Sequence, residues 1–69
     1  MTLEQLRIFV AVAEREHLTK AALELRLTPS AVSSAIKVLE DRYGATLFHR
    51  VGRRIEMTDG GRQIGRAHV

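Results

Sequence analysis

A single helix with both ends marked is the strongest constraint that this sequence places on its fold. Thr28 offers a side-chain oxygen as an N-cap, and Pro29 follows at the first helical position, where its missing N–H removes no hydrogen bond. Apolar side chains then recur at helical spacing, at Val32, Ile36, Leu39 and Tyr43. Gly44 is the residue type that most readily ends a helix in the left-handed conformation. The sequence therefore predicts a helix over 29–43 with one buried face.

A second helix is predicted at the N-terminus, from Thr2 to about Arg15. Thr2 and Gln5 have the spacing of a capping box, in which each side chain hydrogen bonds to the other residue's backbone N–H. The helical apolar pattern consists of Leu3, Leu6, Phe9, Val10 and Ala13. Ile8 and Val12 form another apolar stripe, which belongs either to the core or to a surface for a partner.

A short helix is predicted between these two, over 20–25. Thr19 is expected to cap its N-terminus, and His17 is expected at the C-terminus of the preceding helix. The inward face of the short helix is expected to hold Ala21, Ala22 and Leu25. Because only residues 26 and 27 separate this helix from the Thr28 cap, the connection between the two helices must be tight.

The pattern changes after Gly44 to one typical of a β hairpin. Residues 47–50 and 55–57 have strand character, and the turn 51–54 between them contains Gly52 where a positive φ is expected. Thr58 and Asp59 can cap a further helix, although glycines at 60, 61 and 65 make its sequence a poor helix former.

The basic residues of the chain gather towards its end. The formal net charge is +3. Residues 1–43 are neutral, with six Lys or Arg against six Asp or Glu, whereas residues 44–69 hold five Arg against two acids. This charge distribution is consistent with a polyanionic partner. The alternative is that the basic residues lie on an ordinary solvated surface.

Three helices followed by a basic hairpin is the order of a winged helix-turn-helix. We therefore expect a mainly α fold with a three-helix core, a two-stranded wing and the start of a linker helix. The face of the 29–43 helix opposite its apolar stripe carries Ser30, Ser33, Ser34 and Lys37. Small hydroxyl side chains let a helix approach DNA closely and hydrogen bond to phosphates or base edges. The alternative interpretation is an ordinary solvated helix face.

The identity and spacing of the residues around this helix favour the DNA-binding interpretation. The chain reads Ala21-Ala22-x-x-Leu25-x-x-Thr28-Pro29-Ser30-Ala31-Val32-Ser33-x-x-Ile36-x-x-Leu39-Glu40-x-x-x-Gly44-x-x-Leu47-Phe48-x-Arg50, and then Met57-Thr58-x-x-Gly61. This pattern closely resembles the N-terminal DNA-binding domain of LysR-type transcriptional regulators over residues 1 to about 63. The molybdate-responsive regulators carry a related domain and are a minor competitor.

The resemblance implies a set of DNA contacts with double-stranded DNA as the partner. The 29–43 helix would enter the major groove, and the wing, residues 50–54, would reach the neighbouring minor groove or the backbone. Major-groove contacts would come from Pro29, Ser30, Ser33 and Ser34. Phosphate contacts would come from Thr19, Thr28 and Lys37. Arg53 would enter the minor groove, Arg50 would bind phosphate or brace the wing, and Arg54 is a weaker candidate.

One departure from the family pattern bears on specificity. Many family members carry a long Arg or Gln at the positions of Ser34 and Ala35, and the reading face of this helix has no Arg, Asn or Gln. Those side chains are the usual bidentate readers of guanine and adenine. We therefore expect few direct hydrogen bonds from this helix to base edges. Thymine-methyl contacts and DNA shape are expected to supplement them.

The domain boundaries are expected at residues 1–58 for the winged helix-turn-helix and 59–63 for the start of a linker and dimerisation helix. Residues 63–69 read Gln-Ile-Gly-Arg-Ala-His-Val, which matches CAG ATC GGA AGA GCA CAC GTC, an in-frame translation of a common short-read sequencing adapter. We therefore expect residues 64–69 to be a non-native tail and the effector domain of the parent to be missing.

Several function classes are disfavoured. The chain has no cysteine, and its three histidines have no partners at metal-ligand spacing, so we expect neither a metal site nor another cofactor. No arrangement of nucleophile and base, phosphate loop or paired carboxylates is present, so we do not expect an enzyme. No apolar run is long enough to span a membrane. We expect a cytoplasmic protein.

A protein-interaction module is the alternative function, because some winged helices bind proteins and Ile8 and Val12 offer an apolar patch. Under the family interpretation, the parent is expected to be a homo-oligomer, a dimer or tetramer, that responds to a small-molecule co-inducer. The present chain alone is expected to be monomeric.

Overall fold

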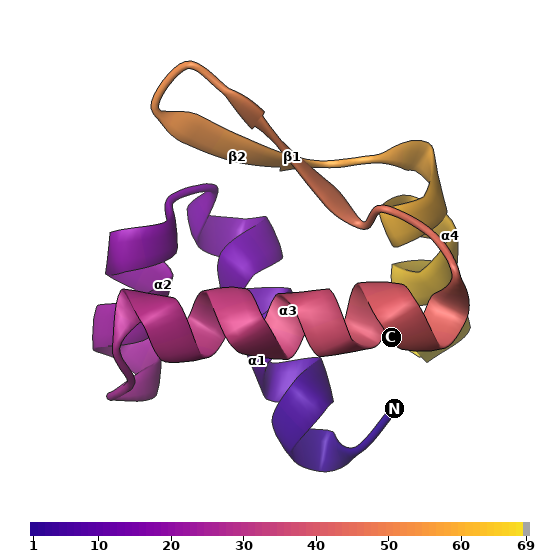
Figure 1. The fold of residues 1–69 in the computed structure, drawn as a ribbon, viewed down its shortest axis with the longest axis horizontal. Coiled ribbons are helices and arrows are strands. Elements are labelled where there is room, and N and C mark those ends of the chain that lie inside the picture. The colour runs from indigo at the N-terminus through magenta and orange to yellow at the C-terminus, as the bar shows by residue number, and fades with distance from the viewer. Residues whose placement is uncertain (69) are drawn as a thin grey trace.

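The computed structural model describes residues 1–68, and the side chains of residues 1–67. Its elements follow in the order α1 (Leu3–Arg15), α2 (Leu18–Leu25), α3 (Pro29–Tyr43), β1 (Phe48–Val51), β2 (Arg54–Met57) and α4 (Asp59–His68). The first three helices pack on one another, the β1–β2 hairpin projects along one side of α3, and α4 lies near the C-terminal end of α3 (Figure 1). The mainly α arrangement of three helices and a two-stranded wing is confirmed.

Local hydrogen bonds place the ends of α1 and α3 where the sequence predicts them. Thr2 and Gln5 form the capping box, with N···O distances of 2.9 and 3.1 Å. Thr28 Oγ1 accepts from the backbone N–H of Ala31 at 3.1 Å, with Pro29 at the first position of α3. Gly44 ends α3 with a φ of 62°, in the left-handed region. These predictions succeed because each depends on residues only a few positions apart.

The start of α2 differs from the prediction. The helix begins at Leu18, and its N-cap is His17, whose Nδ1 accepts from the backbone N–H of Lys20 at 3.3 Å. Thr19 lies inside the first turn and is not the cap, and His17 is not at the end of α1. Glu16 ends α1 in the left-handed conformation, with a φ of 53°. The prediction favoured the hydroxyl of Thr19, but an imidazole nitrogen can also accept, and His17 caps the helix two residues earlier.

The hydrophobic core lies between α1, α2, the inner face of α3 and the base of the hairpin. Its buried residues are Ile8, Phe9, Ala11, Val12, Ala21, Ala22, Val32, Ile36, Leu39, Leu47, Phe48 and Ile55. The expected inner faces of α2 and α3 are thus confirmed, with Leu25 and Tyr43 at their edges only partly buried. Ile8 and Val12 are only 4% and 1% exposed, so an exposed partner surface at these two residues is wrong, whereas Leu3 is 75% exposed.

The hairpin is antiparallel, with Phe48 opposite Met57 and Val51 opposite Arg54. The first strand is shifted by one residue from the predicted 47–50, because Leu47 is buried below the hairpin instead of being paired in it. The second strand ends at Met57 as predicted and starts one residue earlier, because Arg54 pairs with Val51. Gly52 and Arg53 form the two-residue turn, and Gly52 has a φ of 63°. The predicted positive φ is therefore confirmed at the one position where the tight turn requires it.

The helix α4 forms in spite of its glycines and runs from Asp59 to His68. Thr58 caps its N-terminus by accepting from the backbone N–H of Gly61 at 3.1 Å. Ile64 packs against the core, and Gly65 lies beside the Phe9 ring. The helix is thus continuous across residue 64. The expectation that residues 64–69 are a non-native tail concerns the encoding nucleotides and stays a prediction.

Gly61 allows α4 to lie against the chain that enters β1. A Cβ at this position would collide with the carbonyl oxygen of Leu47. That oxygen is held in place because it also accepts from the backbone N–H of Thr58 at 2.9 Å. By contrast, a Cβ on Gly60 would find its nearest neighbour, the Cβ of Ala45, at an ordinary 3.5 Å.

We therefore predict opposite outcomes for two neighbouring substitutions. Gly61→Ala should lower the free energy of unfolding by about 1–3 kcal/mol, the usual cost of overpacking. Gly60→Ala should leave it unchanged or raise it by up to about 1 kcal/mol, because alanine is the better helix former. Urea unfolding followed by circular dichroism measures both, and equal stabilities of the two variants would contradict the close approach at Gly61.

Candidate nucleic-acid interface

The outer face of α3 presents small polar side chains to solvent. Ser30, Ser33, Ser34 and Lys37 are all exposed, while Val32, Ile36 and Leu39 on the opposite face are buried. Pro29 and Thr28 lie exposed at the N-terminal end of the same helix. The division follows from the helical repeat, since residues three or four positions apart share a face. The helix therefore presents a surface of short, hydroxyl-bearing side chains that can fit closely into a groove of DNA.

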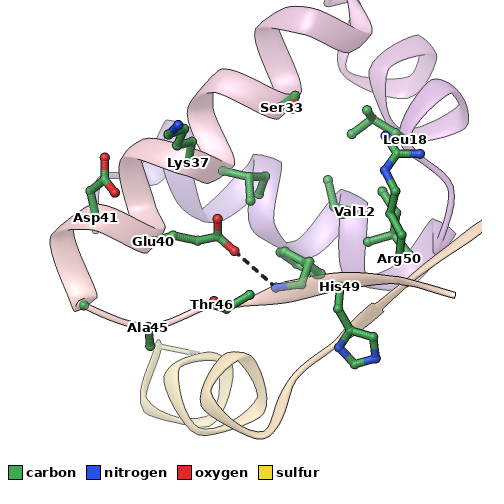
Figure 2. A pocket seen from close by; sticks show the side chains of 14 residues that line it. Val12, Leu18, Ser33, Lys37, Glu40, Asp41, Ala45, Thr46, His49 and Arg50 are labelled. Atoms are coloured by element: carbon green, nitrogen blue, oxygen red, sulfur yellow. Dashed lines mark hydrogen bonds between the residues drawn. The ribbon is translucent and has the colours of Figure 1, made fainter.

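Two open grooves border this surface and join it to neighbouring elements. One runs between the first turns of α3 and the start of α2, and the other runs between α3 and the base of the hairpin. Leu18, Ser33 and Lys37 line both grooves. Figure 2 shows the second groove, with Ser33 and Lys37 along α3 and Arg50 extending from β1 towards Leu18. The reading face of α3 and the base of the hairpin thus form one continuous surface.

The structure brings together most, but not all, of the residues that the sequence predicts for DNA contact. Pro29, Ser30, Ser33, Ser34, Lys37 and Arg50 line the two grooves. Thr19 is exposed in the first turn of α2 and lines neither groove. Arg53 lies in the hairpin turn and Arg54 beside it, both exposed and beyond the groove walls. The two arginines can reach DNA only from the hairpin tip.

The cations of this surface differ in whether an acid pairs with them. Among the described residues, Lys37, Arg50 and Arg53 have no hydrogen bond or ion pair from their side chains. Arg54, by contrast, donates to the carboxylate of Glu56 on the same strand. Three unpaired cations around a polar helix face create positive potential, which attracts a polyanion. Arg54 is already partly neutralised, which makes it the weaker contributor.

The helices behind this surface are held together by a polar contact as well as by the core. The guanidinium of Arg15 at the end of α1 donates to both carboxylate oxygens of Glu24 on α2, at 2.9 and 3.4 Å. These hydrogen bonds lower the pKa of the Glu24 carboxyl below its ordinary value and raise that of Arg15. Both side chains are about half exposed, so their contribution to stability is small.

Two residues that the sequence analysis did not single out belong to the site. Leu18 lines both grooves, and Glu40 accepts from the backbone N–H groups of Leu47 and Phe48 at the start of β1, from within the second groove. Leu18 could have been predicted as an apolar residue at the start of α2 if His17 had been assigned as the cap. Glu40 gives no local signal of this contact, because its partners, Leu47 and Phe48, are seven and eight positions along the chain.

Other kinds of site find no support in the part of the chain that the structure describes. Residues 1–67 hold no group of three or more His, Cys, Asp or Glu side chains placed to bind a metal ion. No helix of the described residues is long and apolar enough to cross a membrane.

Three packed helices, a polar helix face and a basic hairpin at its edge define a winged helix-turn-helix protein. The sequence profile described as "Bacterial regulatory helix-turn-helix protein, lysR family" matches residues 3–62. The chain belongs to this family of bacterial transcriptional regulators. It is 44% identical over 64 residues to the RuBisCO operon transcriptional regulator of Allochromatium vinosum, an alignment that covers 93% of this chain and 21% of that protein. The chain thus spans about a fifth of the length of that relative.

Solved structures of DNA complexes share the fold. The DNA-binding domain of CbnR in complex with DNA superimposes with a TM-score of 0.89 at 31% identity, over 97% of this chain and 77% of that one. The DNA-binding domain of BenM in complex with benA site 1 DNA superimposes with a TM-score of 0.88 at 36% identity, over 97% of this chain and 75% of that one.

The N-cap of α3 supplies a test of how the reading helix is held. Thr28→Ala should lower the free energy of unfolding by about 1 kcal/mol, because the Ala31 N–H loses its partner. Thr28→Ser should keep most of the stability, since a serine hydroxyl can take the same place. Ser34→Ala, on the exposed face of the same helix, is the control and should change stability little. Chemical unfolding of the three variants measures this, and a Thr28→Ala variant as stable as the control would show that the helix starts elsewhere.

Proposed function

We propose that this domain binds double-stranded DNA in a sequence-specific manner, as the DNA-binding part of a bacterial transcriptional regulator. The observation that carries the proposal is the continuous surface formed by the polar face of α3 and the basic hairpin. Family membership and the likeness to the CbnR and BenM DNA complexes support it independently. The role is one of binding and not of catalysis, in keeping with relatives that are transcriptional regulators.

In this proposal α3 lies in the major groove. Its exposed Ser30, Ser33 and Ser34 contact base edges, and Pro29 contributes apolar contact with a thymine methyl group. Lys37 further along the helix binds phosphate. Thr28 is a second phosphate contact, although its hydroxyl oxygen already accepts from Ala31 and so can offer a phosphate only its O–H.

The wing is proposed to contact the DNA next to the major groove that α3 enters. Arg53 at the hairpin turn is proposed to enter the minor groove, where a narrow A·T-rich segment concentrates negative potential. Arg50, the third residue of β1, lines the groove beside α3 and is proposed to bind the phosphate backbone. Thr19 at the start of α2 is a further phosphate contact. Arg54 contributes less because it is paired with Glu56.

The reading face has few long hydrogen-bonding side chains, which shapes the expected specificity. Arg, Asn and Gln are the common bidentate readers of guanine and adenine, and α3 carries none of them on this face. Hydroxyl contacts, thymine-methyl contacts and the shape of the DNA are therefore proposed to carry the discrimination.

The longer parent protein is proposed to be a cytoplasmic homo-oligomer, a dimer or tetramer, that responds to a small-molecule co-inducer. Residues 1–58 are proposed as its DNA-binding domain, and residues 59–63, the first part of α4, as the start of the linker. Support comes from the relatives' greater length, of which this chain covers about a fifth. The domain alone is proposed to be monomeric. Sedimentation velocity on the domain and on the parent tests both statements, and a tight dimer of the domain would contradict the second.

Two substitutions separate the proposed roles of helix and wing. Ser33→Ala should weaken binding to a preferred duplex by about 1–3 kcal/mol and binding to a scrambled duplex hardly at all, because it removes a base contact. Arg53→Ala should weaken binding most on duplexes with A·T-rich flanks. Fluorescence anisotropy at constant salt measures both, with a duplex selected from a random pool as the preferred site.

The control is the same pair of variants on a duplex whose flanks are changed to G·C. There Arg53→Ala should lose less affinity than on the A·T-rich flanks, and Ser33→Ala should lose the same. Equal losses for both variants on every duplex would contradict this division of labour, and absence of binding to any duplex would contradict the proposed function.

A further inference from the structure

Glu40 holds the segment that leaves α3 through both its backbone carbonyl and its side chain. Its backbone carbonyl accepts from the N–H groups of Gly44 and Ala45, the latter at 3.2 Å. Its carboxylate Oε2 accepts from Leu47 at 2.9 Å and Phe48 at 3.5 Å. Figure 2 shows the carboxylate turned away from α3 towards β1. One residue of the reading helix thus accepts from four N–H groups of the chain that leads into the wing.

The position of this carboxylate is electrostatically unfavourable for the helix itself. The C-terminal turns of α3 carry the negative end of the helix dipole, where acids destabilise and bases stabilise. Glu40 is partly buried there and is compensated by the N–H groups of Leu47, just before β1, and of Phe48, its first residue, which donate to the charged carboxylate. Asp41, the next residue, is exposed and makes no hydrogen bond to β1. The compensation is therefore specific to Glu40.

The second strand has a different anchor. The N–H of Ile55 on β2 donates to the carbonyl of Glu16, between α1 and α2, at 2.9 Å. The ring of Phe48 on β1 packs at 5.3 Å from that of Phe9 on α1. These contacts fix both strands to α1, with Phe48 at the open end of the hairpin and Ile55 one pair from the turn, whereas the side chain of Glu40 ties the start of β1 to α3. Because Phe48 begins a strand of only four residues, a change in its position alters the path of the strand that leads to Arg53 at the turn.

We propose that Glu40 is a positioning residue that sets the separation of the wing from the reading helix. With α3 in the major groove, this separation decides which segment of the neighbouring minor groove Arg53 can enter. The inference rests on the proposed function for its consequence on DNA. Its structural part, that the Glu40 carboxylate orders the wing relative to α3, holds for the free protein and is measured there.

The first experiment uses the free protein. Glu40→Ala should raise the amide hydrogen exchange rates of Leu47 and Phe48 by about tenfold, since a hydrogen bond to a charged group is lost from each. It should also lower the ¹⁵N order parameters of residues 50–54 while those of α3 stay unchanged. Glu40→Gln keeps an acceptor oxygen and should restore most of the order. Asp41→Ala removes the same charge from the next residue and is the matched control, with wild-type exchange.

The second experiment is a double-mutant cycle on a duplex with an A·T-rich flank. Glu40→Ala should lose affinity, and the Glu40→Ala/Arg53→Ala double variant should bind within about twofold of Arg53→Ala alone, because the two residues act through one contact. On a duplex with G·C flanks, Glu40→Ala should lose little. A purely structural role would instead lower affinity on all duplexes and multiply the losses.

The two experiments give distinguishable failures. Wild-type exchange and order of the wing in Glu40→Ala would overturn the positioning role, whatever happens on DNA. If the affinity losses of Glu40→Ala and Arg53→Ala multiply in the double variant, while the wing of the free protein is disordered, the link from Glu40 to Arg53 is overturned. Failure of the wild-type domain to bind any duplex would contradict the proposed function, while the exchange experiment would still decide whether Glu40 orders the wing.

Discussion

The buried inner face of α3 is the contact on which the rest of this structure depends. Val32, Ile36 and Leu39 lie in one core with residues of α1, α2 and the hairpin base. A helix that buries one face in this way must turn the other to solvent, and the exposed serines and Lys37 lie on that other face. Loss of this packing would remove the support of the reading face and the hairpin together.

The two helices that precede α3 in the chain, α1 and α2, leave its outer face exposed to solvent. Ala21 and Ala22 are fully buried, and their small side chains let α2 pack closely against its neighbours. The turn between α2 and α3 is only three residues long and includes Arg26 in the left-handed conformation, with a φ of 59°. The N–H of Leu27 donates to the carbonyl of Ala22 at 2.9 Å, which closes the end of α2. This turn fixes the start of α3 beside the start of α2, where Leu18 lines the grooves on both sides.

The fold could be predicted from the sequence wherever its determinants are local. The caps of α3 at Thr28 and Gly44 and the turn glycine at position 52 each depend on a few adjacent residues, and all three predictions are confirmed. Whether Ile8 and Val12 belong to the core or to a partner surface could not be decided from the sequence, because α1 is apolar on two faces and only packing, which here buries both residues, decides which face is covered. The His17 cap was missed because an imidazole can replace a hydroxyl as acceptor.

The candidate site was predictable to a similar degree. The polar face of α3 follows from its helical repeat, and the placement of Pro29, the serines and Lys37 along two connected grooves agrees with that. The pairing of Arg54 with Glu56 is local, because residues two positions apart on a strand share a face, and it follows once β2 is assigned to 54–57. The reach of Glu40 to Leu47 and Phe48 depends on how α3 meets the hairpin. This second contact has no signature in the order of the residues, because it is a product of tertiary structure.

The central claim is that the outer face of α3 and the wing form one DNA-binding surface, and a titration followed by NMR tests it most directly. A ¹⁵N-labelled domain is titrated at low salt with a selected duplex, and amide shift changes are mapped onto the fold. The account predicts changes concentrated in residues 28–37 and 50–54, with little change around the exposed Leu3 on α1 and Leu23 on α2. Changes centred on Leu3 and Leu23, with α3 and the wing unaffected, would contradict it.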